Sequence, residues 1–446
     1  MLYKTLKLLF YLTTRAYFRS ITIAGKNNLP NKDTPVLFVA NHPSAFMDPI
    51  LLGALVKRSL YFLARGDVFK NKMVRPIFNQ LHMIPVYKAD MSPGQMHKNE
   101  SSFEKCFEHL GQNNTLLIFP EGLSKTERRL RPIKTGTARI ALGAEEKHDF
   151  KLGLTVIPIG LNYSNPHVFK SDVLINYGEP ILVSEYKDAF MKDPRDAVVQ
   201  LTERIKTELE AQIVVIEDEQ HEKTIEHIET LYRSTLRQEN TAEEKGIQDF
   251  KLSQEIVKFV EHFAKHEPTV LQRFEQKIST YFEELNRSKL TDKQLRTSAI
   301  RFFMVRRIVY FLIGFPFFLF GLITNVIPFK LTGFICRKIK IREDFVGAVT
   351  LAVGLFMFLI IYGIESYVVA SYTSNLIGVL FLLILYPMGI FTINYFVTYY
   401  KLRGTFNYLL LFMRKSDLIA QLKTKRQELI DELERRKVDY QKLKAS

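Results

Sequence analysis

The first part of the chain alternates short apolar runs rich in β-formers with amphipathic helical patterns. Helical periods occupy 99–110 and 134–147, between the apolar runs. Strands that alternate with helices predict an α/β domain with a mixed sheet flanked by helices, here over 21–183. The proline inside the run at 154–161 predicts either an edge strand of the sheet or a wall of the site, and not a catalytic group. The predicted strands are 35–40, 59–65, 82–88, 114–120, 154–161 and 172–178.

The next region, 184–300, is rich in Glu and Lys and has a helical period throughout. We expect it to form a few antiparallel helices, and no residue pattern in it indicates chemistry. The end of the chain, 401–446, is again charged and helical in period. It predicts a solvated helix in preference to a short coiled coil.

Three uncharged apolar segments follow one another within 301–400. They are Ile308–Phe329, Phe345–Ile364 and Ser366–Tyr400. A helix rises about 1.5 Å per residue, so about 20 residues cross a hydrocarbon core of about 30 Å. Basic residues precede and follow the first segment and follow the last, whereas the loop at 366–375 has none. The positive-inside rule would place all these basic flanks on the cytoplasmic side, which three full spans cannot satisfy. We therefore predict one re-entrant or interfacial segment, 308–329, followed by two spanning helices, with the α/β domain on the cytoplasmic face.

The first 20 residues form an amphipathic helical pattern with apolar residues on one side and basic residues on the rest. Two interpretations stay open: a helix that lies on a membrane, and a helix that packs on the core of the following domain. The domain organisation expected from these patterns is 1–20, 21–183, 184–300, 301–400 and 401–446.

The formal charge of +15 indicates an anionic partner, either nucleic acid or a membrane surface. The apolar segments and the absence of a nucleic-acid-reading motif favour the lipid bilayer and exclude nucleic acid. The two cysteines, Cys106 and Cys336, form neither a metal-binding spacing nor a disulfide framework. We expect no metal and no cofactor.

The stretch 41–49, NHPSAFMDP, follows an apolar run and contains His42 and Asp48. In a regular helix, six residues would place the two side chains on different faces, so they meet only if the chain between them is irregular. Pro49 disfavours the α region at Asp48, which predicts Asp48 as an N-cap with Pro49 at the first helical position. A carboxylate beside a histidine fixes the tautomer and leaves one ring nitrogen free to accept a proton. Taken alone, a capped turn with an incidental histidine is an equal alternative.

A second stretch, 118–136, places Glu121, Gly122 and Ser124 directly after an apolar run and follows them with five cations. Such a density of positive charge suits a substrate that carries a phosphate, although a solvated basic loop is the alternative. A third stretch, 81–88, ends in Lys88, and a fourth, 156–171, is an apolar strand ending in polar residues. The five cations of the second stretch are Lys125, Arg128, Arg129, Arg131 and Lys134.

Taken in their order along the chain, the four stretches resemble the four blocks of the glycerolipid acyltransferase superfamily, over about residues 30–182. Phe119-Pro120-Glu121-Gly122 matches one block literally, and Lys88 stands where the family usually has arginine. Five residues separate His42 from Asp48, where most members have four, and this spacing resembles the fungal glycerol-3-phosphate/dihydroxyacetone-phosphate acyltransferase branch. The flanking runs 130–143 and 160–181 resemble the same branch.

This resemblance implies a membrane-bound O-acyltransferase of phospholipid synthesis. His42 would be the base and Asp48 its partner, and an acyl group would pass from acyl-CoA or acyl carrier protein to a hydroxyl of glycerol-3-phosphate or 1-acylglycerol-3-phosphate. Glu121, Gly122 and Ser124 would shape the acceptor site. The alternatives are acylation of another lysolipid, such as a lyso-aminolipid, and a non-catalytic membrane lipid-binding protein. The candidates for the acceptor phosphate are Arg128, Arg129, Lys134 and Lys88.

Overall fold

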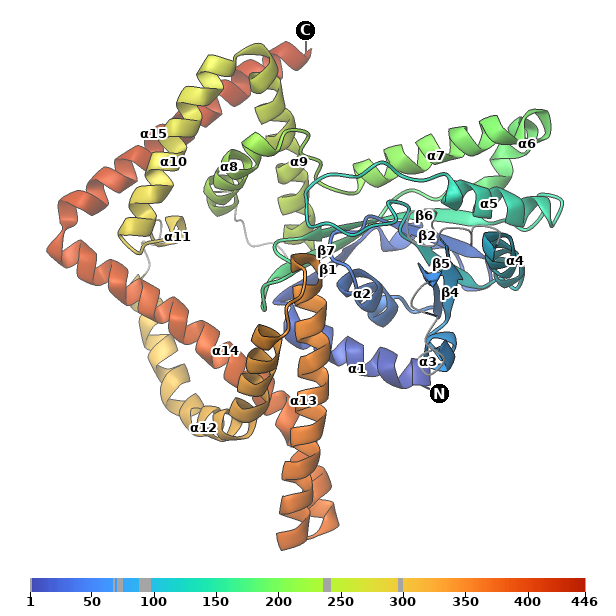
Figure 1. The fold of residues 1–446 in the computed structure, drawn as a ribbon. Helices are drawn as coiled ribbons and strands as arrows, with labels where there is room; N and C mark the ends of the chain where they lie inside the picture. Colours follow the sequence, from blue (N-terminus) through green and yellow to red (C-terminus); the bar gives the residue numbers. More distant parts are fainter. Residues whose placement is uncertain are drawn as a thin grey trace. The chain divides into compact units, whose positions relative to one another are not determined.

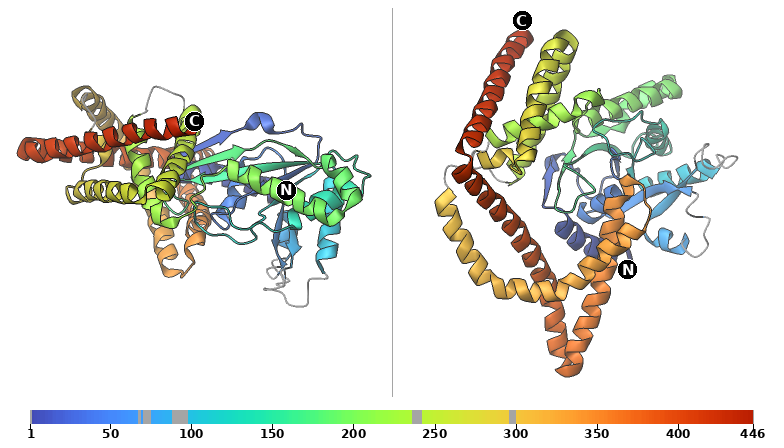
Figure 2. Two further views of the ribbon diagram at one scale, coloured as in Figure 1. Left: turned by 90° about the horizontal axis from the view of Figure 1, so that it is seen from above. Right: turned by 60° about the vertical axis from the view of Figure 1, so that its left-hand side comes forward.

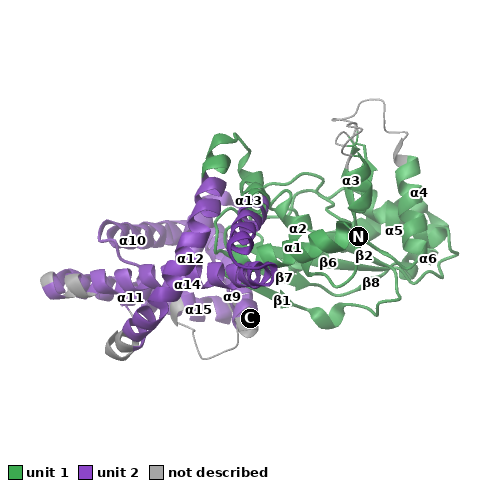
Figure 3. Ribbon diagram, turned by 90° about the horizontal axis from the view of Figure 1, so that it is seen from below, with its two compact units in different colours: residues 1–215, 334–355 green, residues 216–333, 356–446 purple. Residues whose placement is uncertain are grey.

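The computed structural model forms two compact units, which Figure 3 shows in separate colours. The first unit contains residues 1–215 and 334–355, and the second contains 216–333 and 356–446. Each unit is described by itself below. The residues that the structure describes are 2–66, 69, 75–87, 98–235, 242–295 and 300–445.

The first unit is built on one mixed sheet of eight strands in the order β1-β7-β6-β2-β5-β3-β4, with β8 also paired to β6. Every pair is parallel except those that β6 makes with β7 and β8. The predicted α/β fold with a mixed sheet is confirmed. The strands are β1 (Ser20–Ala24), β2 (Val36–Ala40), β3 (Leu60–Arg65), β4 (Met83–Val86), β5 (Thr115–Ile118), β6 (Thr155–Tyr163), β7 (Asp172–Tyr177) and β8 (Ile181–Leu182).

Helices cover both faces of this sheet (Figure 1). The central strand β2 is therefore apolar at every position. Its successive residues enter opposite cores: Leu37 belongs to one core cluster and Phe38 to the other. One face packs against α4 (Lys98–Gly111), α5 (Gly136–Glu146) and α7 (Pro194–Ala211). The other face packs against α1 (Leu2–Tyr17), α2 (Met47–Leu55) and the first turns of α13 (Glu343–Tyr372). The short helices α3 (Arg75–Gln80) and α6 (Lys187–Lys192) complete the unit.

Strand β6 is central, so the edge position expected from its proline is wrong. On one side β6 pairs with β2 through Ile159, and on the other it pairs with β8 at Thr155 and Val156 and with β7 from Ile159 onward. Pro158 lies in the gap between these last two partners, where a missing N–H leaves no ladder bond unmade. Its carbonyl still accepts a hydrogen bond from the N–H of Gly178, at 2.8 Å.

Helix α1 packs on the first unit through one face and exposes apolar side chains on another. The ammonium group of Lys7 donates to the carbonyls of Val56 and Arg58, and the backbone N–H of Leu60 donates to the Tyr3 hydroxyl. Leu8 is 60% exposed. Packing on the core and contact with a membrane are therefore compatible, and the membrane contact stays a prediction.

The second unit contains a helical bundle in which the C-terminal helix takes part. Arg426 of α15 (Ser416–Ala445) forms a buried ion pair with Asp292, at 2.7 Å, and the Tyr281 hydroxyl donates to the same carboxylate. Leu422 and Leu433 of α15 are also buried. The solvated helix expected for this tail is wrong, because one side of it packs on the bundle. The other helices are α8 (Glu222–Thr235), α9 (Ala242–His266), α10 (Pro268–Arg287) and α11 (Asp292–Leu295).

Three helices are long and apolar enough to cross a membrane: α12 (Ile300–Lys338), α13, and α14 (Asn375–Arg414). Figure 2 shows them from two further sides. Polar contacts join them, including Tyr362 Oη to Asn325 Oδ1 at 2.5 Å and Ser366 Oγ to the carbonyl of Gly378 at 2.7 Å.

The segment predicted to re-enter the membrane is part of one helix. α12 continues through Pro316 and Pro328 without interruption, and Figure 1 shows it as a curved helix. The described residues of 308–329 therefore contain no re-entrant turn, and the interfacial position stays a prediction.

Candidate active site

The His42 turn begins where the buried strand β2 ends. Asn41 continues the ladder with its side chain: its Oδ1 accepts from the N–H of Leu161 at 2.7 Å, and its Nδ2 donates to the Leu161 carbonyl at 3.1 Å. The side-chain amide thus replaces one residue of backbone pairing with β6. This anchors the end of β2 and lets the chain turn away at His42.

His42 and Asp48 meet as the sequence predicted. His42 Nδ1 lies 2.8 Å from Asp48 Oδ2, and the Asp48 side chain has no exposed surface. The same oxygen accepts from the N–H of Ser44 at 2.8 Å. The intervening chain is an irregular turn, as the spacing requires.

The predicted helix start is wrong by two residues. α2 begins at Met47 with Phe46 as N-cap, so Asp48 and Pro49 lie inside the first turn. Asp48 accepts its backbone N–H bond from Ser44, which precedes the helix, and this draws the carboxylate back over the turn toward His42. The partnership with histidine, and not capping, decides where Asp48 lies.

Tyr163 supplies the other hydrogen bond to Asp48. Its hydroxyl donates to Oδ1 at 2.8 Å from the end of β6. Burial, followed by the adjacent charge of Asp48, raises the pKa of Tyr163 well above its usual value, so the phenol remains a donor. Both oxygens of Asp48 are thus held by donors on two different elements.

Glu121 does not face outward but holds two backbone segments together. Its Oε1 accepts from the N–H of His42 at 2.7 Å, and its Oε2 accepts from the N–H of Arg131 at 3.2 Å. Burial raises the pKa of Glu121, and the two N–H donors oppose that effect. The carboxylate therefore joins the turn after β2 to the loop after β5.

The loop after β5 is folded against the His42 turn along its length. Gly122 has φ +74°, a conformation that glycine adopts without strain. The N–H of Lys125 donates to the His42 carbonyl at 3.2 Å, and the Thr126 hydroxyl donates to the Pro43 carbonyl at 2.9 Å. The second sequence block thus supports the first one through its backbone.

The reactive side of the histidine ring is open. His42 stacks on Phe119 with ring centroids 4.1 Å apart, and its side chain is 17% exposed. Among the described residues, Nε2 has no hydrogen-bond partner. A ring fixed at Nδ1 and stacked on an aromatic face presents Nε2 to a bound hydroxyl, the geometry that a general base requires.

The basic cluster is organised around an acid. Lys125, Arg129 and Arg131 all form ion pairs with Glu127, at 2.9, 3.0 and 2.5 Å. Desolvation alone would raise the pKa of Glu127, but these three partners outweigh it and lower the pKa to about 2. Arg129, one of the residues predicted to bind the acceptor phosphate, therefore pairs with Glu127. A phosphate would have to replace that carboxylate as the partner of Arg129.

The other predicted site residues are placed as follows. Lys134 is exposed, and its N–H donates to the Pro120 carbonyl at 3.0 Å. Arg128 is half-buried on the same loop. The Ser124 hydroxyl donates to Asp344, at 2.6 Å. Lys88 lies outside the described residues.

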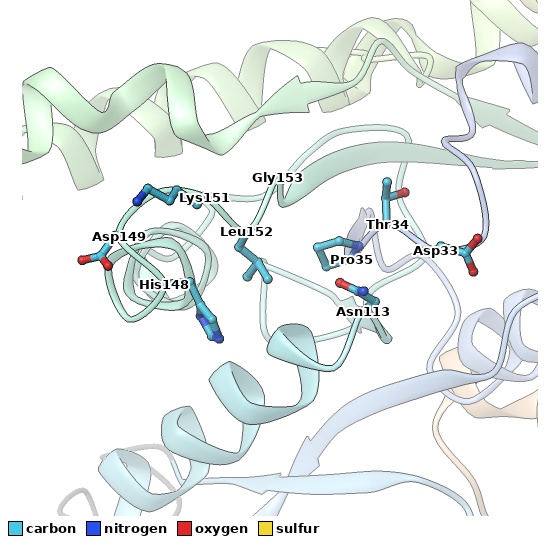
Figure 4. Close-up of a pocket in the computed structure, with 9 residues that line it drawn as sticks. All are labelled: Asp33, Thr34, Pro35, Asn113, His148, Asp149, Lys151, Leu152 and Gly153. Atoms are coloured by element: carbon cyan, nitrogen blue, oxygen red, sulfur yellow. The ribbon is translucent and has the colours of Figure 1, made fainter.

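A cavity of the first unit is remote from this site. A cavity of about 520 Å³ opens at the opposite edge of the sheet, where β2, β5 and β6 begin (Figure 4). Asp33, Asn113, His148 and Lys151 are among the residues that line it. Among the described residues, no group of three or more His, Cys, Asp or Glu side chains is placed to hold a metal ion.

Sequence reasoning missed three residues of the site. Asn41 directly precedes His42, so its position could have indicated it. Tyr163 follows the predicted strand and could have been suspected as a polar residue at a strand end. Asp344 gave no signal, because it lies 220 residues beyond Ser124.

Comparisons with known proteins identify relatives of the first part of the chain. Residues 20–162 match the Acyltransferase family model. The chain is 26% identical over 318 residues to glycerol-3-phosphate O-acyltransferase 1 of Saccharomyces cerevisiae, covering 52% of this chain and 42% of the yeast protein. It is 34% identical over 141 residues to glycerol-3-phosphate O-acyltransferase 2 of the same yeast, covering 31% and 18%.

A plant relative is also similar. The chain is 29% identical over 144 residues to a chloroplast 1-acyl-sn-glycerol-3-phosphate acyltransferase of Arabidopsis thaliana, covering 32% of this chain and 36% of that protein. The chain thus spans less than half the length of these relatives. Residues 20–162 are an acyltransferase domain. This domain belongs to the glycerolipid acyltransferase superfamily and resembles the fungal glycerol-3-phosphate acyltransferases.

Proposed function

We propose that this protein transfers a fatty acyl group from an acyl thioester to a hydroxyl of glycerol-3-phosphate or 1-acylglycerol-3-phosphate at a membrane, as a step of phospholipid synthesis. The observation that carries the proposal is the His42–Asp48 pair, held by Ser44 and Tyr163 and open at Nε2. The relatives named above act on these two acceptors. The thioester is that of coenzyme A or of acyl carrier protein.

In the proposed reaction His42 Nε2 removes the proton from the acceptor hydroxyl as its oxygen attacks the thioester carbonyl. Asp48 stabilises the imidazolium that forms, because its buried carboxylate lies 2.8 Å from Nδ1. Collapse of the tetrahedral intermediate expels the thiolate, which takes up the proton from His42. The ester and the free thiol are the products.

We propose two further roles within this function. Glu121 positions His42 through its backbone, since both carboxylate oxygens accept N–H bonds. Arg128 and Lys134 meet the acceptor phosphate, with Arg129 joining them after exchange with Glu127, and Lys88 stays a candidate. Gly122 and Ser124 shape this acceptor site from the loop after β5.

The proposed orientation places the first unit on the cytoplasmic side. Residues 334–355 belong to that unit and carry Arg337, Lys338, Lys340 and Arg342 directly before α13. The α13–α14 turn, near Ser374, carries no Lys or Arg. The positive-inside rule then assigns the basic end of α13 to the cytoplasm. The test is Ser374→Cys in a Cys336→Ser background. This variant should react with a membrane-impermeant maleimide that is added on the side opposite the cytoplasm, and not with one that is added on the cytoplasmic side.

The direct test uses washed membranes, labelled long-chain acyl-CoA, and the two acceptors in parallel, with His42→Ala beside the wild type. Acyl transfer to one acceptor that is lost in the variant supports the proposal and identifies the substrate. Acyl carrier protein replaces coenzyme A if neither acceptor is labelled. Transfer by His42→Ala at the wild-type rate, or no transfer from either donor, contradicts it.

A further inference from the structure

The first turn of α13 lies against the active-site loops of the first unit. Asp344, only 7% exposed, accepts a hydrogen bond from the Ser124 hydroxyl at Oδ2, at 2.6 Å. The guanidinium of Arg342 holds the same carboxylate through Nε at 3.0 Å and Nη2 at 2.6 Å. The carboxylate is thus fixed by two donors, one from its own segment and one from the loop after β5.

Neighbouring residues contact the other two loops at this edge of the sheet. The ring of Phe345 meets the ring of Phe46, within the His42–Asp48 turn, edge to face at 5.2 Å. A β-carbon on Gly347 would come within 2.3 Å of the Pro166 carbonyl oxygen, in the loop after β6, so only glycine allows this approach. One helical turn therefore touches the loops after β2, β5 and β6.

Apolar packing fixes this turn on the domain. Ala348 and Leu351 of α13 are each 2% exposed, and they share one core cluster with Met47 and Leu51 of α2. Because α2 carries Asp48 in its first turn, the helix that holds the partner of His42 shares a buried cluster with α13. The first turns of α13 are therefore part of the buried core of the first unit and do not merely contact its surface.

The length of α13 is consistent with two tasks. Its 30 residues rise about 45 Å, whereas about 20 residues cross the hydrocarbon core. About ten residues remain, and Asp344, Gly347, Ala348 and Leu351 all lie within the first ten. By length alone, α13 can pack its first turns on the active-site loops and still cross a membrane.

We propose that Asp344 is a positioning residue of the acyltransferase site, through which the membrane helix α13 holds His42 in its reactive geometry. This inference rests on the function proposed above. The route is short: Asp344 fixes Ser124, and the next residue, Lys125, donates its N–H to the His42 carbonyl at 3.2 Å. Asp344 lies well outside residues 20–162, which match the family model. The site is thus completed by a segment beyond the acyltransferase domain.

The test compares Asp344→Ala, Asp344→Asn, Ser124→Ala and the Asp344→Ala/Ser124→Ala double variant in full-length protein in membranes. Glu343→Gln is the matched control, because it removes a carboxylate from an exposed neighbouring position. We expect Asp344→Ala to lower kcat about tenfold with KM for the acceptor within about twofold, since the acceptor is still bound but the base is misplaced. Asp344→Asn keeps an acceptor oxygen and should restore most of the rate. The double variant should be no slower than the slower single variant.

A second readout does not depend on activity. Trypsin cleaves after Lys125, Arg128 and Arg129 but not at the Arg131–Pro132 bond, so the rate of cleavage between 125 and 130 reports how firmly this loop is held. Cleavage should accelerate in Asp344→Ala and in Ser124→Ala but not in Glu343→Gln.

The outcomes separate this inference from the proposed function. An active wild type with an unaltered Asp344→Ala rate overturns the inference alone, as does a slower variant whose cleavage rate is unchanged. A wild type that acylates neither acceptor from either donor overturns both. Equal losses in Asp344→Ala and Glu343→Gln would assign the effect to general charge and also overturn it.

Discussion

The two edges of the sheet in the first unit differ in what they offer a substrate. The edge where β2, β5 and β6 begin has a cavity of about 520 Å³, lined by Asp33, His148 and Lys151 among others (Figure 4). The opposite edge has a histidine whose partner carboxylate is fully buried and held by two further donors. Each edge has a histidine held at Nδ1, but the partner of His148 is the backbone carbonyl of Ala144, at 2.9 Å, whereas the partner of His42 is a buried carboxylate that stabilises an imidazolium. A buried carboxylate partner, and not the volume of a cavity, therefore distinguishes the candidate site, which lies where open α/β sheets usually place their sites.

The largest expected effect comes from replacing the histidine at each edge of the sheet with alanine and comparing the two variants. His42→Ala should lower acyl transfer by about 10²- to 10⁴-fold, the range that a general base contributes. His148→Ala, at the cavity edge, should change it by less than about twofold. The measurement is initial acylation rate in membranes with equal amounts of each variant. A large loss in His148→Ala would show that the comparison assigns the chemistry to the wrong edge.

The next effect concerns the partner of the base. Asp48→Asn keeps the shape of the side chain but removes the charge that stabilises the imidazolium, and we expect about a 10²-fold loss of kcat. Tyr163→Phe removes one donor to Asp48 and should cost less than about tenfold. The pair is checked by kcat over a pH series. A smaller loss in Asp48→Asn than in Tyr163→Phe would contradict the assigned order of roles.

The difference between the edges also explains how far the sequence could be interpreted. His42, Asp48 and Glu121 lie close to strand ends within the sequence, so local patterns predicted both the sheet and the partnership of histidine and aspartate. The strand position of Pro158 was mistaken because the pattern of one strand does not reveal that its neighbour changes from β8 to β7 at that residue. The contact of Asp344 with Ser124 joins residues 220 apart, and no local pattern encodes such a contact.

The role of Glu121 was also only partly predictable. The sequence placed it in the acceptor site, whereas its carboxylate accepts two backbone N–H bonds. A carboxylate after a strand is equally able to face a substrate or the backbone, and only the folded loops decide between them. The charge of the loop was likewise predicted, but its organisation around Glu127 depends on the loop's own conformation.

Glu121→Gln tests this backbone role with a moderate effect. The glutamine retains one acceptor oxygen but replaces the other with an NH₂ group, so either His42 or Arg131 loses a partner for its N–H. An unsatisfied buried donor costs about 1–3 kcal/mol, and part of this cost is offset because the variant no longer buries the negative charge of Glu121. We expect a slightly less stable first unit and about a tenfold lower kcat, measured by denaturant unfolding and initial rates. A raised KM for the acceptor with kcat unchanged would instead indicate direct contact with substrate.

The smallest effect is the pH dependence of the basic loop at the catalytic edge. The pKa of Glu127 is lowered to about 2, since its three cationic partners outweigh desolvation. A carboxylate with a depressed native pKa contributes stability that is complete above its unfolded pKa, about 4.5, and is lost as pH falls toward 2. Partly exposed pairs are screened, so we expect the wild type to exceed Glu127→Gln by about 1 kcal/mol near neutral pH, with the difference shrinking below about pH 4.5 and disappearing below about pH 2. Asp149→Asn, an exposed carboxylate at the cavity edge, is the matched control and should show a smaller difference at every pH. Equal pH profiles for the two variants would mean that the ion pairs around Glu127 do not order this loop, and the two edges would then differ in the His42–Asp48 pair alone.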